Sequence, residues 1–213
     1  MSAVVFDFGA VLFQWQPLAL LQRCVPELAA DDAAARRLAA QIFESFTPDS
    51  DWARFDLGRI AEAELAERIA ARTGIGALQA RRVIDAIPPH LQPQPATVAL
   101  LGPLRAAGHR LFYLSNMPRP YADHLERCNP FIAEFADGIF SGRVGLMKPD
   151  AAIYALAETR FSLDPAHTLF IDDHAGNVQA AAGRGWQTLQ FADATSCEQA
   201  LRQRGWLPAG AAR

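Results

Sequence analysis

The chain of 213 residues has little cysteine, no basic cluster and no long apolar run. Its three cysteines are scattered and form no Cys-x-x-Cys pair, which excludes a disulfide framework and a cysteine zinc site and favours a reducing compartment. A net charge of −3 without a Lys/Arg-rich run excludes a nucleic-acid binder that depends on a basic surface. The apolar runs fall short of the roughly 18 residues that span a bilayer. We therefore expect a cytoplasmic protein without signal peptide or membrane anchor, and with neither nucleic acid nor membrane as partner.

Hydrophobic residues are plentiful by contrast. They make up 51% of the chain, and charged residues make up 20%. This balance allows a sizeable core and excludes intrinsic disorder. At about 100–200 residues per domain, the length fits one domain or one domain with an insertion.

The first apolar segments indicate an insertion. Ala3–Phe6 is a short buried-strand pattern that ends at Asp7, and the next segment of this kind is Leu111–Leu114. A crossover between parallel strands needs about a dozen residues, and roughly 100 lie between these two.

The intervening residues have helical patterns. Asp31–Phe46 carries apolar side chains at four-residue spacing, Ala61–Thr73 does the same and is followed by Gly74, and Gln79–Ile87 is a third candidate stopped by Pro88-Pro89. We expect a small helical cap domain at residues 16–88, inserted into a core formed by residues 1–15 and 89–213.

Strand and helix patterns alternate after the insert, which favours an α/β fold with a doubly wound, Rossmann-like parallel sheet. The expected strands are Leu111–Leu114, Gly138–Ser141, Thr168–Ile171 and Gln187–Phe191. The expected helices are Ala96–Ala107, Arg119–Arg127, one that starts near Pro149–Ile153, Asn177–Gly183 and one near Cys197–Arg204.

Polar residues directly follow three of these strands: Asp7, Ser115-Asn116 and Asp172-Asp173. In a doubly wound sheet the ligand crevice lies at the carboxyl ends of the strands, so we expect these residues to converge. Adjacent carboxylates repel each other unless a cation neutralises them. Together with Asp7 they form a cluster of hard oxygen ligands suited to Mg²⁺, which commonly binds alongside a substrate phosphate.

Lys148 supplies a positive charge. It lies in the segment Gly145–Asp150 of a chain rich in arginine and poor in lysine, and a proline follows it. Its ammonium group could hold a phosphoryl oxygen and keep Asp7 ionised.

These motifs resemble, in order and spacing, those of the haloacid dehalogenase superfamily, and the cap lies where that family inserts one. The Asp-x-Gly-x-Val form of the first motif looks like that of bacterial sugar 1-phosphate phosphatases. The motifs are Asp7-Phe8-Gly9-Ala10-Val11, Ser115-Asn116, Lys148-Pro149, and Asp172-Asp173 with Asn177.

The resemblance implies a Mg²⁺-dependent phosphatase for a small phosphorylated metabolite. Asp7 would be the nucleophile and form an aspartyl-phosphate that water hydrolyses. The Gly9 carbonyl and Asp172 would join Asp7 on the metal, and Asp173 would be a further ligand or would position Lys148. Ser115 and the Asn116 amide would grip phosphoryl oxygens. Asn177 would orient the metal-site carboxylates or a metal-bound water.

Gly9 departs from the pattern, because many phosphatases of this family have there a second aspartate that acts as general acid. Such a group contributes roughly 10²–10⁴-fold. Three explanations stay open: a good leaving group such as a sugar 1-phosphate, a proton donated by a cap residue or water, or weak catalysis.

Other readings and the specificity residues also stay open. One alternative is a metal-independent 2-haloacid dehalogenase, which Asp172-Asp173 argues against, and another is a phospho-ligand-binding protein with little activity. Phe13, Gln14 and Trp15 are expected to line the mouth of the site. Arg54, in an irregular segment beside Trp52 and Phe55, is expected to contact an anionic group or a sugar hydroxyl, although aromatic residues there are typical of a bundle core.

Overall fold

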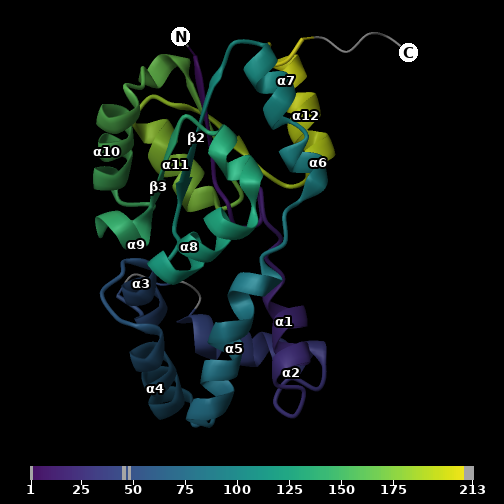
Figure 1. The fold of residues 1–213 in the computed structure, drawn as a ribbon, viewed down its shortest axis with the longest axis vertical. Coiled ribbons are helices and arrows are strands. Elements are labelled where there is room, and N and C mark those ends of the chain that lie inside the picture. Colours follow the sequence, from purple (N-terminus) through teal and green to yellow (C-terminus); the bar gives the residue numbers. More distant parts are fainter. Residues whose placement is uncertain (1, 45–46, 48, 209–213) are drawn as a thin grey trace.

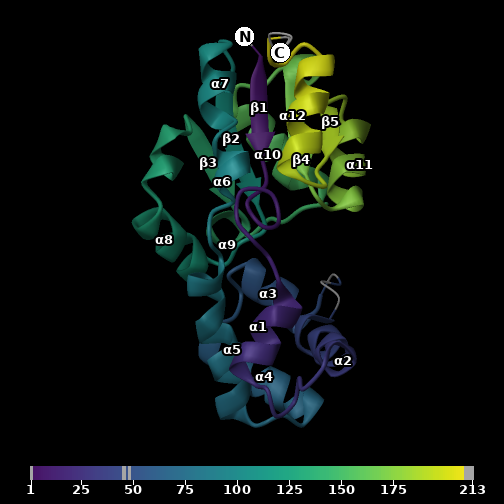
Figure 2. The ribbon, with the colours of Figure 1, turned by 90° about the vertical axis from the view of Figure 1, so that its right-hand side faces the viewer.

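A five-stranded parallel sheet lies at the centre of the computed structural model, which describes residues 2–44, 47 and 49–208. Each pair of neighbouring strands is parallel, which confirms the expected doubly wound architecture. The strands stand in the order β3-β2-β1-β4-β5 (Figure 2). They are β1 (Ala3–Phe6), β2 (Arg110–Ser115), β3 (Asp137–Phe140), β4 (Thr168–Asp172) and β5 (Gln187–Gln190).

Helices cover both faces of the sheet (Figure 1). Strand residues alternate between the faces, so Val4 and Phe6 of β1 join one apolar cluster and Val5 joins the other. The helices that pack into the first cluster are α7 (Leu101–Ala106), α8 (Arg119–Cys128) and α12 (Ala194–Gln203), and those in the second are α10 (Ala151–Phe161) and α11 (Ala175–Gly183). Shorter elements are α6 (Pro95–Val98), α9 (Ser141–Val144) and the 3-10 helices η2 (Pro130–Glu134) and η3 (Pro165–His167).

The remaining helices lie together beyond one end of the sheet and form what we call the helical unit (Figure 1). Their apolar faces pack against one another, as Leu38, Leu65 and Ile84 show by being buried. The members are α1 (Pro17–Cys24), α2 (Asp32–Phe43), α3 (Asp51–Asp56), α4 (Glu62–Thr73) and α5 (Ala77–His90).

Two chain segments run side by side between the sheet and the helical unit. The Gln14 amide donates to the Gln92 carbonyl and the Gln94 amide donates to the Leu12 carbonyl, each at 2.8 Å. The Gln94 side-chain amide also donates to the carbonyl of Ala10, at 2.8 Å. The linkers are therefore tied to each other and to the turn that follows β1.

Helix α5 differs from the expectation, because it continues through Pro88-Pro89 to His90. A proline inside a helix leaves the carbonyl four residues earlier without its amide partner. For Pro88 that carbonyl belongs to Ile84, and the hydroxyl of Tyr121 on α8 donates to it at 2.9 Å. A side chain from α8 thus replaces the donor that Pro88 removes.

Other boundaries also differ. The expected helix Ala96–Ala107 is split into α6 and α7, and Pro103 is tolerated because it falls in the first turn of α7. The segment around Trp52 is not irregular: it is helix α3, whose start Ser50 caps by accepting from the Ala53 amide. Helix α2 ends at Phe43, and Phe46 lies outside the described residues. Gly74 ends α4 with a φ of 75°, as expected.

We find in the described residues no helix with the length and apolar composition needed to cross a membrane.

Candidate active site

The carboxyl ends of three strands bring the predicted residues together. Phe6 at the end of β1 is in register with Tyr113 of β2 and Ile171 of β4, so Asp7 follows beside Asp172. The Asp7 amide donates to the Ile171 carbonyl at 2.9 Å and prolongs this pairing by one residue. Ser115 ends β2 at the same edge and is buried. Parallel pairing thus brings Asp7 together with groups that lie more than a hundred residues later in the sequence.

Lys148 lies between two of these carboxylates. Its Nζ is 2.9 Å from Asp7 Oδ1 and 2.6 Å from Asp172 Oδ2, and the residue is only 2% exposed. The ammonium also lies over the ring of Phe170, 5.5 Å from its centre. Burial disfavours the charged amine, but the carboxylates of Asp172 and Asp7 outweigh this effect and raise the pKa of Lys148.

Asp7 is buried and has one oxygen committed to partners inside the protein. Oδ1 accepts from the Phe8 amide at 2.7 Å and from Lys148, whereas Oδ2 has no donor among the residues that the structure describes. Burial raises the pKa of Asp7 to about 7, the Lys148 charge opposes this rise, and Asp172 adds to it. Oδ2 is therefore the oxygen left for contact with a ligand.

Asp172 is fully buried and is held on both oxygens. The side chain of Asn177 donates to Oδ1 at 3.0 Å and to Oδ2 at 3.1 Å, and the His174 amide donates to Oδ1 at 2.8 Å. The hydroxyl of Tyr154 on α10 donates in turn to the Asn177 carbonyl at 3.0 Å. Asn177 thus orients a carboxylate of the site and is itself oriented from behind.

A cluster of three carboxylates, those of Asp7, Asp172 and Asp173, could hold a cation. One oxygen of each lies within 4.8 Å of the others. Burial and the neighbouring Asp172 raise the pKa of Asp173. Carboxylate oxygens are the hard ligands that Mg²⁺ prefers, so the donor set fits this ion.

Asp173 does not position Lys148, contrary to one of the two roles expected for it. The lysine contacts Asp7 and Asp172, while Asp173 is exposed and makes no ion pair with it. Strand geometry gives the reason, because alternate residues share a face and Asp172 lies on the Phe170 side that carries Lys148. The other role, that of a further metal ligand, remains compatible with the cluster.

The side chain of Asn116, by contrast, contacts the main chain of Lys148. Its Nδ2 donates to the Lys148 carbonyl at 2.9 Å, and its Oδ1 accepts from the Lys148 amide at 2.8 Å. Only the backbone amide of Asn116 was expected at the site from the sequence, and this contact of the side chain was not predicted.

The three residues expected at the mouth of the site differ in their exposure. Phe13 is fully buried against the rings of Phe8 and Phe131, so it belongs to the core and the expectation was wrong for it. Its apolar neighbours Val11 and Leu12 are fully buried as well, so the turn after β1 belongs to the core. Gln14 is exposed, and Trp15 is partly buried with its ring against Phe43.

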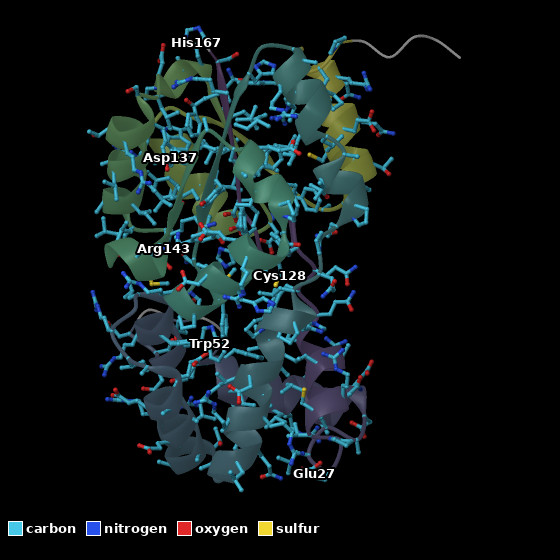
Figure 3. All side chains as sticks on the ribbon, viewed as in Figure 1. Glu27, Trp52, Cys128, Asp137, Arg143 and His167 are labelled. Atoms are coloured by element: carbon cyan, nitrogen blue, oxygen red, sulfur yellow. The ribbon has the colours of Figure 1, made fainter. Side chains whose placement is uncertain are left out.

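Arg54 lies on α3, at the end of the helical unit that faces the sheet. Trp52 of α3 and Arg143 of α9 lie on opposite sides of the boundary between the helical unit and the part of the molecule that contains the sheet (Figure 3). Trp52 is buried against Phe43, which agrees with its expected place in a core. Arg54 is partly buried, and its side chain forms no ion pair or hydrogen bond within the described part of the chain.

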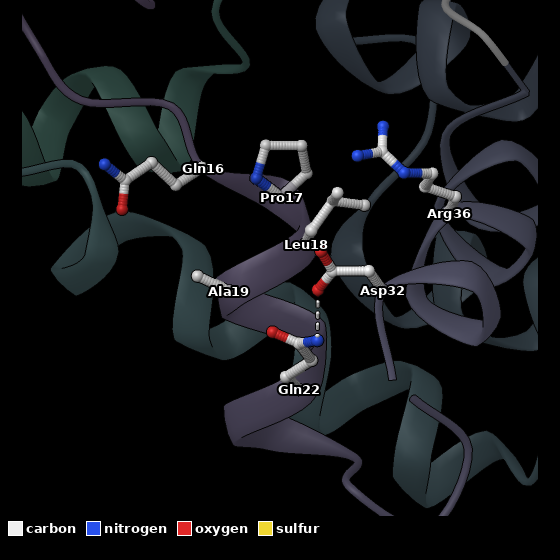
Figure 4. A pocket seen from close by; sticks show the side chains of 7 residues that line it. All are labelled: Gln16, Pro17, Leu18, Ala19, Gln22, Asp32 and Arg36. Atoms are coloured by element: carbon white, nitrogen blue, oxygen red, sulfur yellow. Dashed lines mark hydrogen bonds between the residues drawn. The ribbon is translucent and has the colours of Figure 1, made fainter. Parts of the chain in front are cut away.

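A shallow hollow elsewhere contains none of the predicted site residues. It lies between α1 and α2 in the helical unit, where Gln22 donates to Asp32 at 2.9 Å (Figure 4). Its lining is polar and apolar without a cluster of converging charges, so it does not compete with the sheet edge as a reaction centre. The lining residues are Gln16, Pro17, Leu18, Ala19, Gln22, Asp32 and Arg36.

Three supporting side chains were not predicted from the sequence. Tyr154 and Phe170 look like ordinary core aromatics in the sequence, and Gln94 lies in a proline-rich linker. No pattern marks them, because each acts on a partner that only the fold brings near. Their contacts are with Asn177, Lys148 and Ala10, respectively.

Known proteins with similar sequences include a phosphatase and a dehalogenase. The chain is 26% identical over 203 residues to a sesquiterpene phosphatase of Aspergillus oryzae, covering 95% of each chain. It is 27% identical over 192 residues to an (S)-2-haloacid dehalogenase of Pseudomonas putida, covering 87% of this chain and 82% of the relative.

Solved structures show the same fold. A haloacid dehalogenase family enzyme of Bacteroides thetaiotaomicron, in complex with magnesium and inorganic phosphate, matches with a TM-score of 0.66 at 22% identity, covering 91% of this chain and 96% of that one. An L-2-haloacid dehalogenase of Xanthobacter autotrophicus matches with a TM-score of 0.68 at 22% identity, covering 96% and 83%.

The family model of the haloacid dehalogenase-like hydrolases matches residues 1–185 and so includes the strands, the lysine loop and the carboxylates described above. The chain is therefore a hydrolase that belongs to the haloacid dehalogenase-like family.

Proposed function

We propose that this hydrolase is a Mg²⁺-dependent phosphatase that acts on a small phosphate monoester through an aspartyl-phosphate on Asp7. The observation that carries the proposal is the cluster of Asp7, Asp172 and Asp173 with the Lys148 ammonium beside two of them. Three carboxylates so close together repel each other, and a single ammonium neutralises only one of them. A divalent cation and a phosphoryl group complete the charge balance of such a site.

Asp7, Asp172 and the Gly9 carbonyl would hold the magnesium ion, with Asp173 as a further ligand or as a partner of its water shell. When bound, the ion supplies charge neutralisation for the phosphoryl oxygens. The bonds from Asn177 and the His174 amide fix Asp172 in place, so its oxygens need no rearrangement on binding. Support comes also from the solved relative that contains magnesium and inorganic phosphate.

The residues of the chain have separate tasks in this reaction. Oδ2 of Asp7 attacks phosphorus while the bond to the leaving oxygen breaks, and water later attacks the aspartyl-phosphate to release phosphate and the carboxylate. Lys148, the Ser115 hydroxyl and the Asn116 amide bind the phosphoryl oxygens. The Ser115 hydroxyl is free for this, because it has no partner among the described residues.

The helical unit would act as the cap and set substrate choice. Gly9 cannot protonate a leaving group, and a Cβ at this position would meet no atom within 4 Å, so the space of the absent acid is open. A substrate with a good leaving group, such as a sugar 1-phosphate, needs no acid there. Gln14, Trp15 and Arg54 are the proposed specificity residues, because none of them is fully buried and Arg54 pairs with no carboxylate of the described residues.

A panel of phosphate monoesters, assayed with and without Mg²⁺, tests the proposal. It should contain sugar 1-phosphates and, because a relative is a sesquiterpene phosphatase, prenyl phosphates. Asp7→Asn is the matched control, since it keeps the shape of the nucleophile and removes its charge. Turnover in wild type that needs Mg²⁺ and is lost in Asp7→Asn supports the proposal. Thermal stabilisation by beryllofluoride or phosphate without any turnover would instead indicate a phospho-ligand-binding protein.

A 2-haloacid dehalogenase is the second candidate, favoured by the similarity to the Pseudomonas putida enzyme. It predicts metal-independent halide release from 2-chloropropionate. Asp173 argues against it, because a third carboxylate beside the nucleophile disfavours an anionic 2-halo acid in the absence of a cation. Absence of chloride release in the presence of a chelator would remove this candidate.

A further inference from the structure

The side chain of Asn116 faces the main chain of Lys148 with both of its polar atoms. Nδ2 donates to the Lys148 carbonyl and Oδ1 accepts from the Lys148 amide, at 2.9 and 2.8 Å. The two residues lie 32 positions apart, on the loops that follow β2 and precede α10. The carboxamide thus satisfies the amide and the carbonyl of Lys148, the two main-chain groups that a neighbouring strand would otherwise pair.

The ammonium group of Lys148 keeps its position only if the main chain of its loop is held in place. Its side chain has four rotatable bonds, so the place of its ammonium depends on where the loop holds its main chain. The ammonium must reach Asp7 and Asp172 at the same time, at 2.9 and 2.6 Å. A shift of the loop by about 1 Å would change the distance from the ammonium to these carboxylates or require a different side-chain rotamer.

We propose that the carboxamide of Asn116 is a positioning group, which fixes the Lys148 ammonium between Asp7 and Asp172 and acts on the reaction through the lysine. The inference rests on the proposed function only for its effect on turnover; the positioning itself concerns the protein without substrate. Asn116 would then contribute to the site twice, with its backbone amide on the phosphoryl group and its side chain on the lysine loop.

The alternative is that the carboxamide binds the substrate directly. Both of its polar atoms are already paired with Lys148, and contact with a substrate would require the side chain to turn away from the loop. The two readings differ in one measurable respect. If the carboxamide is a positioning group, its removal has little effect on turnover once the lysine is gone. If it contacts the substrate, its removal keeps its full effect on turnover.

Chemical labelling tests the positioning without any turnover, because Lys148 is the only lysine of the chain. Trinitrobenzenesulfonate reacts with exposed amines, and the α-amino group serves as internal reference. We expect Asn116→Ala to raise the labelling rate of Lys148 about tenfold or more, since the loss of two hydrogen bonds frees the loop.

Ser141→Ala is the matched control. Its hydroxyl accepts from the Met117 amide at 2.9 Å and donates to the Asp56 carbonyl, so it supports the same loop without touching Lys148. This variant should label within about twofold of wild type. An unchanged rate in Asn116→Ala, or an equal rise in Ser141→Ala, would overturn the proposal.

A double-mutant cycle on phosphatase activity tests the effect on catalysis. Asn116→Ala should lower kcat about 10- to 100-fold, the range for groups that orient a catalytic ligand from behind. In a Lys148→Met background the same substitution should cost less than about twofold. Additive effects would show that Asn116 acts independently of the lysine. If no phosphate ester is turned over by wild type, the proposed function fails, and the labelling result still decides the positioning role.

Discussion

The hydroxyl of Tyr121 donates a hydrogen bond of 2.9 Å to the carbonyl of Ile84, across the junction between α8 and α5. This carbonyl is the one whose helical partner Pro88 removes. Tyr121 is 2% exposed, and burial raises the pKa of its hydroxyl well above the ordinary value, so it remains a neutral donor. Tyr121 of α8, a helix that packs on the sheet, therefore stabilises the last turn of α5.

The loss of this hydroxyl should be measurable in stability. We predict that Tyr121→Phe lowers the free energy of unfolding by about 1–2 kcal/mol, because the Ile84 carbonyl loses the donor that replaces its helical partner. In a Pro88→Ala background, the restored backbone amide should reduce this cost. Denaturant unfolding of the four variants measures the coupling, and equal costs in both backgrounds would contradict the explanation.

Removal of the Lys148 ammonium should leave the repulsion between Asp7 and Asp172 without compensation and lower the stability. We predict that Lys148→Met, measured with a chelator present, loses about 3–5 kcal/mol of stability, since Asp7 and Asp172 are then left buried without their partner. Mg²⁺ should restore more stability to this variant than it adds to wild type. Thermal unfolding with and without the metal tests this, and an equal gain in both proteins would count against a cation site at these carboxylates.

The open space at Gly9 predicts a gain of activity. A Cβ there meets no atom within 4 Å, so Gly9→Asp should be accommodated without displacing neighbours. For substrates with poor leaving groups, the new acid should raise kcat by about tenfold or more. Gly9→Asn is the matched control, because its side chain has about the same size and no acidic proton. Equal rates in the two variants would show that an acid at this position does not assist the leaving group.

The burial of the Asp56 carboxyl should make the stability of the protein depend on pH. This carboxyl at the end of α3 is 6% exposed and makes no hydrogen bond or ion pair among the described residues, and burial raises its pKa to about 8. The folded state keeps the proton while the unfolded state, with an ordinary pKa near 4, loses it. The contribution of Asp56 is therefore fully present below about pH 4 and is lost as the pH rises to about 8.

Comparison with Asp56→Asn isolates this group. Between about pH 4 and pH 8 the free energy of unfolding of wild type should fall relative to that of the variant, in total by up to a few kcal/mol. Urea unfolding at several pH values provides the measurement. Parallel curves for the two proteins would show that Asp56 is ionised in the folded state.

The sequence by itself determined which polar residues gather at the carboxyl edge of the sheet. Short apolar strands that end in Asp7, Ser115 and Asp172 suffice for this, because the carboxyl ends of parallel strands always meet at one edge of the sheet. Lys148 was also identifiable, as a lysine in a loop before a helix. These predictions depend on local pattern and on topology, which the order of elements encodes.

Only the tertiary structure decided how those residues are held. The pairing of Asn116 with Lys148, the hydroxyl of Tyr121 on Ile84 and the burial of Phe13 all join segments that no local pattern relates. The orientation of Asp173 away from the lysine likewise followed from the face that β4 presents. Hydrogen bonds and packing act over a few ångströms, so they depend on which distant segments the complete fold brings into contact.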